Sequence, residues 1–168
     1  SKLGPYYIYA GLLNKGSSYS ANYLAHALAL AKFLKSRYER LLIMGLSQGG
    51  EAALLVSLQA EPAGALVASG YSTTKTRLER ANIEQIIIPS VAEHLDPSKL
   101  KLALIDSPSH FMFSYGKQER GYYGYEANRG MTADAFADIP NIEVVTHSGG
   151  HVFDPKSLHR FLDQWSRN

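Results

Sequence analysis

A serine lies between two glycines in the stretch Gly-Leu-Ser-Gln-Gly at positions 45–49. An apolar run at 41–44 leads into this stretch, and helix-forming residues at 51–59 follow it without a loop. This order predicts a strand, a sharp turn and a helix, with Ser47 at the apex of the turn. Such a turn holds the serine in strained backbone and directs its hydroxyl above the sheet. The pattern therefore indicates nucleophilic chemistry.

The residues around Ser47 should support that chemistry. Side chains at Gly45 and Gly49 are expected to collide with the neighbouring strand and helix, so glycine is predicted to be required at both positions. The helix that begins behind the serine presents the positive end of its dipole, which favours an oxyanion. A purely structural reading is a tight turn from a parallel strand into its crossover helix.

In this strand–turn–helix context, the G-x-S-x-G pattern at 45–49 resembles the nucleophile elbow of the α/β-hydrolase superfamily. A serine hydroxyl is a poor nucleophile at neutral pH, so it needs a base and an acid that orients the base. In that superfamily the order along the chain is serine, acid, histidine. The resemblance implies that Ser47 is the nucleophile and that its partners follow two later strands.

A histidine follows the last predicted strand, 142–146, after the residues Ser-Gly-Gly. This resembles the Gly-His step after the last strand of α/β-hydrolases, and it implies that His151 is the base. Glycines would let the loop bend so that the imidazole reaches back over the serine. His147 is the competing candidate, but it lies nearer the strand, where a structural role is more usual.

The acid is expected in the segment after the strand 110–115. Glu119 fits the superfamily pattern of strand, glycine, two residues and acid, although the superfamily more often has Asp there. Asp106 is the alternative, because it also follows an apolar run. The structural alternative is that Glu119 is a solvated loop charge that forms an ion pair with Lys117 or Arg120. The weaker candidates are Glu126, Asp134 and Asp154.

Acyl transfer also needs an oxyanion hole, and the resemblance implies the backbone N–H of Gln48 as one donor. The superfamily usually takes the other donor from a His-Gly or Gly-Gly loop, and no such loop precedes Ser47. Leu12, in the loop after a predicted strand at 6–10, is the substitute candidate. Otherwise an upstream segment of a longer chain supplies the donor. The edge at 6–10 is then expected to be covered by that segment or by a second copy.

Strands and helices are predicted to alternate along the chain, which favours a mostly parallel sheet with helices on both faces, in one domain spanning 1–168. The short stretch 72–100 leaves room for a small cap at most. The predicted strands are 6–10, 41–44, 64–69, 110–115 and 142–146, and the predicted helices are 23–38, 51–59, 77–92, 97–104, 132–137 and 155–165.

Composition narrows the function classes. The net charge of +2 is too small to indicate a nucleic-acid partner, and no apolar stretch approaches the length of a membrane span. The chain has no cysteine, and its histidines show no i, i+4 pairing of a zinc site. We therefore expect neither a metal nor a cofactor.

The leading interpretation is a serine hydrolase that cleaves an ester, thioester or amide of a small-molecule or acyl substrate through an acyl-enzyme, with an esterase as the first choice. The alternative is a non-catalytic α/β-hydrolase-like domain that serves binding or assembly. A nucleotide-binding α/β domain is disfavoured, because the turn at 44–50 lacks both a phosphate-binding Lys and the G-x-G-x-x-G spacing.

Overall fold

The computed structural model describes residues 15, 17–70, 97–120 and 132–166. The elements in chain order are α2 (Tyr19–Lys35), β1 (Leu42–Leu46), α3 (Gln48–Ala60), β2 (Gly64–Ala68), α6 (Pro97–Ile105), β3 (His110–Gly116), β4 (Ile142–His147) and α8 (Pro155–Ser166). Residues 132–136 are also helical. The strand predicted at 6–10 and the helix predicted at 77–92 lie outside the described residues.

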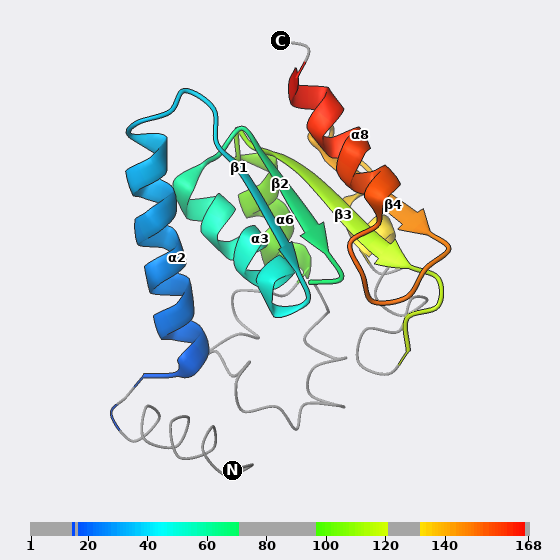
Figure 1. Ribbon diagram of the computed structural model, residues 1–168, viewed down its shortest axis with the longest axis horizontal. Helices are drawn as coiled ribbons and strands as arrows, with labels where there is room; N and C mark the ends of the chain where they lie inside the picture. The colour runs from blue at the N-terminus through cyan, green and yellow to red at the C-terminus, as the bar shows by residue number, and fades with distance from the viewer. Residues whose placement is uncertain (1–14, 16, 71–96, 121–131, 167–168) are drawn as a thin grey trace.

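The described strands form one parallel sheet in the order β1-β2-β3-β4, which confirms the predicted sheet (Figure 1). The register pairs Leu46 with Ala68 and Ala68 with Ser114, and it pairs Gly116 with His147. All the strands therefore end at the same edge of the sheet. Open parallel sheets carry their sites at this edge.

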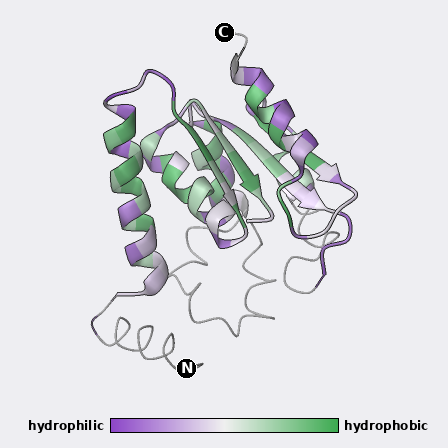
Figure 2. Cartoon of the chain, in the orientation of Figure 1, coloured by the Kyte–Doolittle hydropathy of each residue, from purple (hydrophilic) through white to green (hydrophobic). Residues whose placement is uncertain are grey.

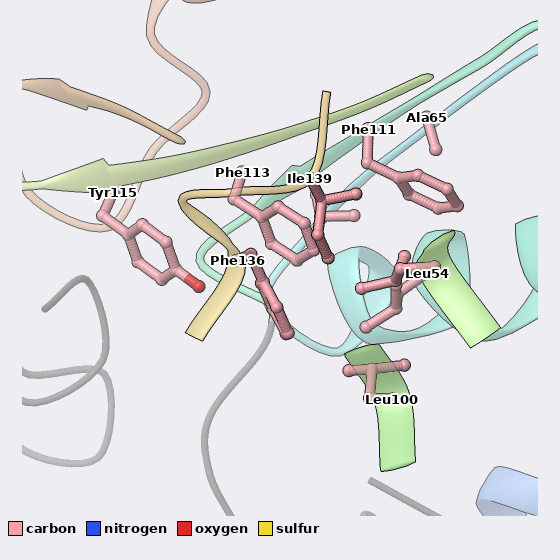
Figure 3. Close-up of a cluster of buried hydrophobic side chains, with 10 residues drawn as sticks. Leu54, Ala65, Leu100, Phe111, Phe113, Tyr115, Phe136 and Ile139 are labelled. Atoms are coloured by element: carbon pink, nitrogen blue, oxygen red, sulfur yellow. The ribbon is translucent and has the colours of Figure 1, made fainter. Parts of the chain in front are cut away.

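Alternating residues of the strands face opposite sides, as the pleat of a strand requires. On one side, aromatic residues of β3 pack with Leu54 of α3 and Leu100 of α6 (Figure 3). On the other side, Leu66 and Met112 pack against α8. The predicted helices on both faces are therefore confirmed.

Helix α8 forms because its sequence is strongly two-sided. Its residues Leu158, Phe161, Leu162 and Trp165 recur at helical spacing and pack against the sheet, while polar residues face outward (Figure 2). Pro155 lies in the first turn, where its missing N–H costs nothing. The helix matches the prediction to within one residue.

The long helix α2 begins earlier than predicted. Its cap is Ser18, which lies in extended backbone and accepts a hydrogen bond from the N–H of Ala21 at 3.0 Å. Capping by Ser18 lets the helix begin at Tyr19, and the helix then packs on α3 and β1 through Ala31 and its apolar neighbours. Among the described helices, none combines the length and apolar character that a membrane crossing demands.

Candidate active site

Ser47 alone separates the end of β1 from the start of α3. Its backbone has φ 61° and ψ −126°, a conformation that costs a non-glycine residue about 1–3 kcal/mol. Its N–H donates to the carbonyl oxygen of Ala68 at 2.9 Å, which ties the turn to the end of β2. The strained backbone predicted for this serine is present, and Gln48 follows it as the first residue of α3.

The glycines around Ser47 differ in what surrounds them. A Cβ on Gly45 would lie 1.8 Å from the carbonyl oxygen of Gly49, so glycine is required there. A Cβ on Gly49 would meet nothing within 4 Å, so the predicted collision at this position is wrong. The crowded position is Gly50, whose Cβ would lie 2.7 Å from the carbonyl oxygen of Ala68. Since α3 begins at residue 48, residue 50 faces β2.

Glu119 lies in the turn that follows β3. Its N–H donates to the carbonyl oxygen of Gly116 at 3.1 Å, and the N–H of Lys117 donates to the carbonyl oxygen of His147 at 2.8 Å. The carboxylate is fully buried, with 0% of the side chain exposed. Lys117 and Arg120 are both exposed. Glu119 is therefore not a solvated loop charge.

His151 is the histidine that meets this carboxylate. Its Nδ1 lies 3.6 Å from Oε1 of Glu119, and 37% of its side chain is exposed to solvent. Close packing brings the two loops together, because a Cβ on Gly116 would lie 2.2 Å from the carbonyl oxygen of Gly150. The separation exceeds a normal hydrogen bond but lies within the range of an ion pair.

His147, the competing histidine, ends β4 and is 9% exposed. Its Nδ1 accepts a hydrogen bond from the N–H of Gly149 at 3.2 Å, which shapes the loop leading to His151. The imidazole is thus held in the body of the loop by its own chain. This arrangement suits the structural role that its position near the strand predicts.

Of the alternative acids, Asp106 follows α6 and precedes β3, so it lies at the opposite edge of the sheet from Ser47. A strand of this length spans about 20 Å, which separates Asp106 from the site. Asp134 is exposed on the helical stretch 132–136. Leu12 and Glu126 lie outside the described residues.

Asp154, the remaining alternative, caps α8. One of its carboxylate oxygens accepts hydrogen bonds from the N–H and the hydroxyl of Ser157, both at 2.8 Å. Burial raises the pKa of Asp154, but these hydrogen bonds, with smaller contributions from His147 and Lys156, outweigh it, so the pKa lies below its ordinary value. The Asp154 carboxylate is therefore engaged as the N-terminal cap of α8.

Ser69 is a site residue that the sequence reasoning missed. It follows β2 directly, with φ 48°, and its hydroxyl donates to Oε1 of Glu119 in the protein interior. Its N–H donates to the carbonyl oxygen of Ser114 on β3 at 2.8 Å. The available signal was its position, since a serine at the carboxyl end of a central strand lies at the edge that holds the site.

The site is thus assembled from loops at one edge of the sheet. Ser47 follows β1, Ser69 follows β2, Glu119 follows β3 and His151 follows β4. In the described part of the chain, no group of three metal-binding side chains comes together. The arrangement offers a serine, a carboxylate–imidazole pair and a helix N-terminus, which are the components of acyl transfer.

The comparison with solved structures gives the architecture a name. An acetyl xylan esterase from Paenibacillus sp. R4 superimposes with a TM-score of 0.61 at 18% identity, over 92% of this chain and 55% of that one. A SOBER1 variant from Arabidopsis thaliana gives 0.56 at 18% identity, over 87% and 62%. An α/β hydrolase from a lagoon-sediment metagenome at Mar Chica, Morocco, gives 0.57 at 14% identity, over 88% and 69%.

The chain has the α/β-hydrolase fold. No protein-family model and no curated protein matches the sequence, so the fold rests on structural likeness. The chain spans between 55% and 69% of the length of these three structures. Within the α/β-hydrolase fold, Ser47, Glu119 and His151 follow the chain order of the nucleophile, acid and base.

Proposed function

We propose that this chain is a serine hydrolase that cleaves an ester, thioester or amide bond through an acyl-enzyme, in a single domain. The observation that carries the proposal is the fully buried Glu119 carboxylate facing Nδ1 of His151, at the same sheet edge as the strained Ser47. Burying a carboxylate is costly, so its position beside an imidazole calls for a role. Orienting a catalytic histidine is such a role.

In the proposed mechanism, the Ser47 hydroxyl attacks the carbonyl carbon of the substrate while Nε2 of His151 takes its proton. Glu119 accepts from Nδ1 of His151, which fixes the ring and stabilises the imidazolium. The negative charge that develops on the carbonyl oxygen faces the N-terminus of α3, with the N–H of Gln48 as a donor. His151 then protonates the leaving group, and water hydrolyses the acyl-enzyme by the same steps.

A small acyl ester is the first substrate to test, and p-nitrophenyl acetate is a suitable probe. One structural neighbour is an acetyl xylan esterase, which is consistent with that choice. In this proposal the substrate is a small molecule or an acyl group, and no cofactor takes part.

A fluorophosphonate tests the nucleophile. We expect one label per chain, at Ser47, and none in the Ser47→Ala variant, because only a serine beside a general base reacts with this reagent at neutral pH. Ser148→Ala is the matched control, since Ser148 is exposed in the loop near His151 but is not assigned a role. Peptide mapping by mass spectrometry locates the label. A label at Ser148 or Ser109 would refute Ser47 as the nucleophile, and no label at all would favour the non-catalytic alternative.

Glu119→Gln tests the acid. The neutral amide keeps the shape of the side chain but cannot stabilise the imidazolium, so kcat on p-nitrophenyl acetate should fall by about 10⁴. Asp106→Asn is the matched control and should be silent, because Asp106 lies at the far edge of the sheet. Circular dichroism of both variants checks that the fold is retained. The opposite ranking of the two variants would make Asp106 the acid.

The proposal also concerns β1, the outermost strand on one side of the described sheet. Among the described residues β1 pairs with β2 alone, and Met44 on this strand is 45% exposed. An open edge invites pairing with another strand. The sequence placed this association at 6–10, which lies outside the described residues, and at β1 we propose that a second copy of the chain or an upstream segment covers the edge. A covering segment could also bring the second oxyanion donor.

A further inference from the structure

We propose that Ser69 is a positioning residue of the hydrolytic site, holding the Glu119 carboxylate in place for His151. The inference rests on the proposed function and extends it to a residue outside the serine, acid and histidine. It starts from a conflict between the identity of residue 69 and its backbone.

Residue 69 has φ 48°, in the left-handed region where glycine is the favoured residue. A serine there costs about 1–2 kcal/mol relative to glycine. The side chain is also buried, with 1% of the residue exposed, so the hydroxyl gives up its contacts with water. On backbone grounds alone glycine would be the better residue, and the hydroxyl must therefore make a compensating contact.

That contact is the Glu119 carboxylate. The Ser69 hydroxyl donates to Oε1, the same oxygen that lies 3.6 Å from Nδ1 of His151. The other oxygen, Oε2, is buried and has no hydrogen-bond partner among the described residues. Among the described residues, Ser69 is thus a side-chain donor in hydrogen-bond contact with the fully buried Glu119 carboxylate. Hydrogen bonds to charged groups are stronger than those between neutral groups.

The location of Ser69 suits this role. Its N–H is bonded to β3 through the carbonyl oxygen of Ser114 at 2.8 Å, so the hydroxyl is held on the sheet itself rather than on a loose loop. The preceding residue, Ala68, accepts the hydrogen bond from the N–H of Ser47 at 2.9 Å. Residues at the end of β2 therefore hold both the turn that carries Ser47 and the Glu119 oxygen that faces His151.

Two substitutions separate the hydroxyl from the backbone. Ser69→Ala removes the hydroxyl and keeps the backbone strain, whereas Ser69→Gly removes both. If the hydroxyl positions Glu119, both variants should lose about 10-fold to 100-fold in kcat on p-nitrophenyl acetate with KM unchanged, since Ser69 is buried and its hydroxyl is bonded to Glu119. This range corresponds to the strength of one hydrogen bond to a charged group. The rate of fluorophosphonate labelling at Ser47 should fall in parallel.

Ser114→Ala is the matched control. Ser114 is as buried as Ser69, at 1% exposure, and its hydroxyl has no hydrogen-bond partner in the described part of the chain. It should leave kcat unchanged. Thermal denaturation of all three variants accompanies the kinetics, and Ser69→Gly should be at least as stable as Ser69→Ala because glycine tolerates the positive φ.

A double-mutant cycle shows whether Ser69 acts through Glu119. In the Glu119→Gln background, Ser69→Ala should lower kcat or the labelling rate by less than about threefold, since the group it positions is already lost. A full additional loss would mean that Ser69 acts independently, and it would overturn the inference. Wild-type kinetics in Ser69→Gly would overturn it too, by showing that only backbone shape matters.

The outcomes also distinguish this inference from the proposed function. If wild-type protein is labelled at Ser47 and the Ser69 variants react at the wild-type rate, only the role of Ser69 is refuted. If wild-type protein is not labelled at Ser47, the proposed hydrolase function fails and the role of Ser69 fails with it.

Discussion

Alanine substitutions at the glycines around Ser47 should have opposite effects on stability. Gly49 lies in the first turn of α3, and a Cβ there would meet nothing within 4 Å. Glycine in a helix is less favourable than alanine by about 0.5–1 kcal/mol. Gly49→Ala should therefore stabilise the protein by about that amount, which for a chain of this size raises Tm by about 1–4 °C.

Gly45→Ala should do the reverse. Its Cβ would lie 1.8 Å from the carbonyl oxygen of Gly49, a backbone atom that cannot rotate away. Relief requires moving the start of α3, and overpacking of this kind costs about 3 kcal/mol. The corresponding fall in Tm is about 6–12 °C. Gly50→Ala, with contacts of 2.7 and 2.8 Å to backbone atoms of β2 and its loop, should fall between the two.

Thermal denaturation followed by circular dichroism measures all three variants under one set of conditions. Gly150→Ala is the control, since its Cβ would also meet nothing within 4 Å but it lies outside the helix. If Gly49→Ala lost as much stability as Gly45→Ala, the steric argument would be wrong. The absence of a side chain at Gly49 would then be required for the turn, as it is at Gly45.

Two further predictions concern α8 and the β1 edge. Asp154→Ala should destabilise the protein by about 0.5–2 kcal/mol near neutral pH, whereas Asp154→Asn should keep most of the cap. The pKa of Asp154 is lowered in the folded state. Its contribution to stability is therefore complete above the unfolded pKa of about 3.9 and is lost as the pH falls through the folded pKa. The Tm values of wild type and Asp154→Ala should accordingly converge in acid. If a second copy covers the β1 edge, sedimentation velocity should show a species heavier than the 18.5 kDa monomer, and Met44→Lys should reduce its amount. If the monomer lacks a second oxyanion donor, its turnover of simple esters should be about 10²–10³ lower than that of a site with both donors. A monomer that hydrolyses p-nitrophenyl acetate rapidly would contradict both parts of this last expectation.

Much of the architecture follows from local sequence patterns. The apolar run before Ser47 and the helix-forming residues after it predict the strand, turn and helix that are observed at 42–60. The helix predicted at 155–165 is α8, which begins at Pro155 and buries one stripe of its surface. Helix starts were less accurate, since capping depends on which polar side chain reaches an N–H, and in α2 Ser18 does so and moves the start from residue 23 to Tyr19.

The sequence by itself determined the chemical types available and the strands that carry them. Order along the chain and the position of each residue just after a strand indicated Ser47, Glu119 and His151 as one group, because parallel strands end at a common edge. These patterns are local in the sequence, so they can be recognised without knowledge of any contact between distant segments.

Only the tertiary structure decided which groups meet. Burial of Glu119 and its approach to His151 depend on how the loop after β3 packs against the loop after β4, and no local pattern encodes that contact. The same is true of Ser69, whose hydroxyl reaches Glu119 across 50 residues of sequence. Crowding at Gly50 rather than Gly49 likewise arises because α3 begins at Gln48 and turns residue 50 toward β2. Such contacts depend on the distance and orientation of whole elements, which the sequence specifies only through the complete fold.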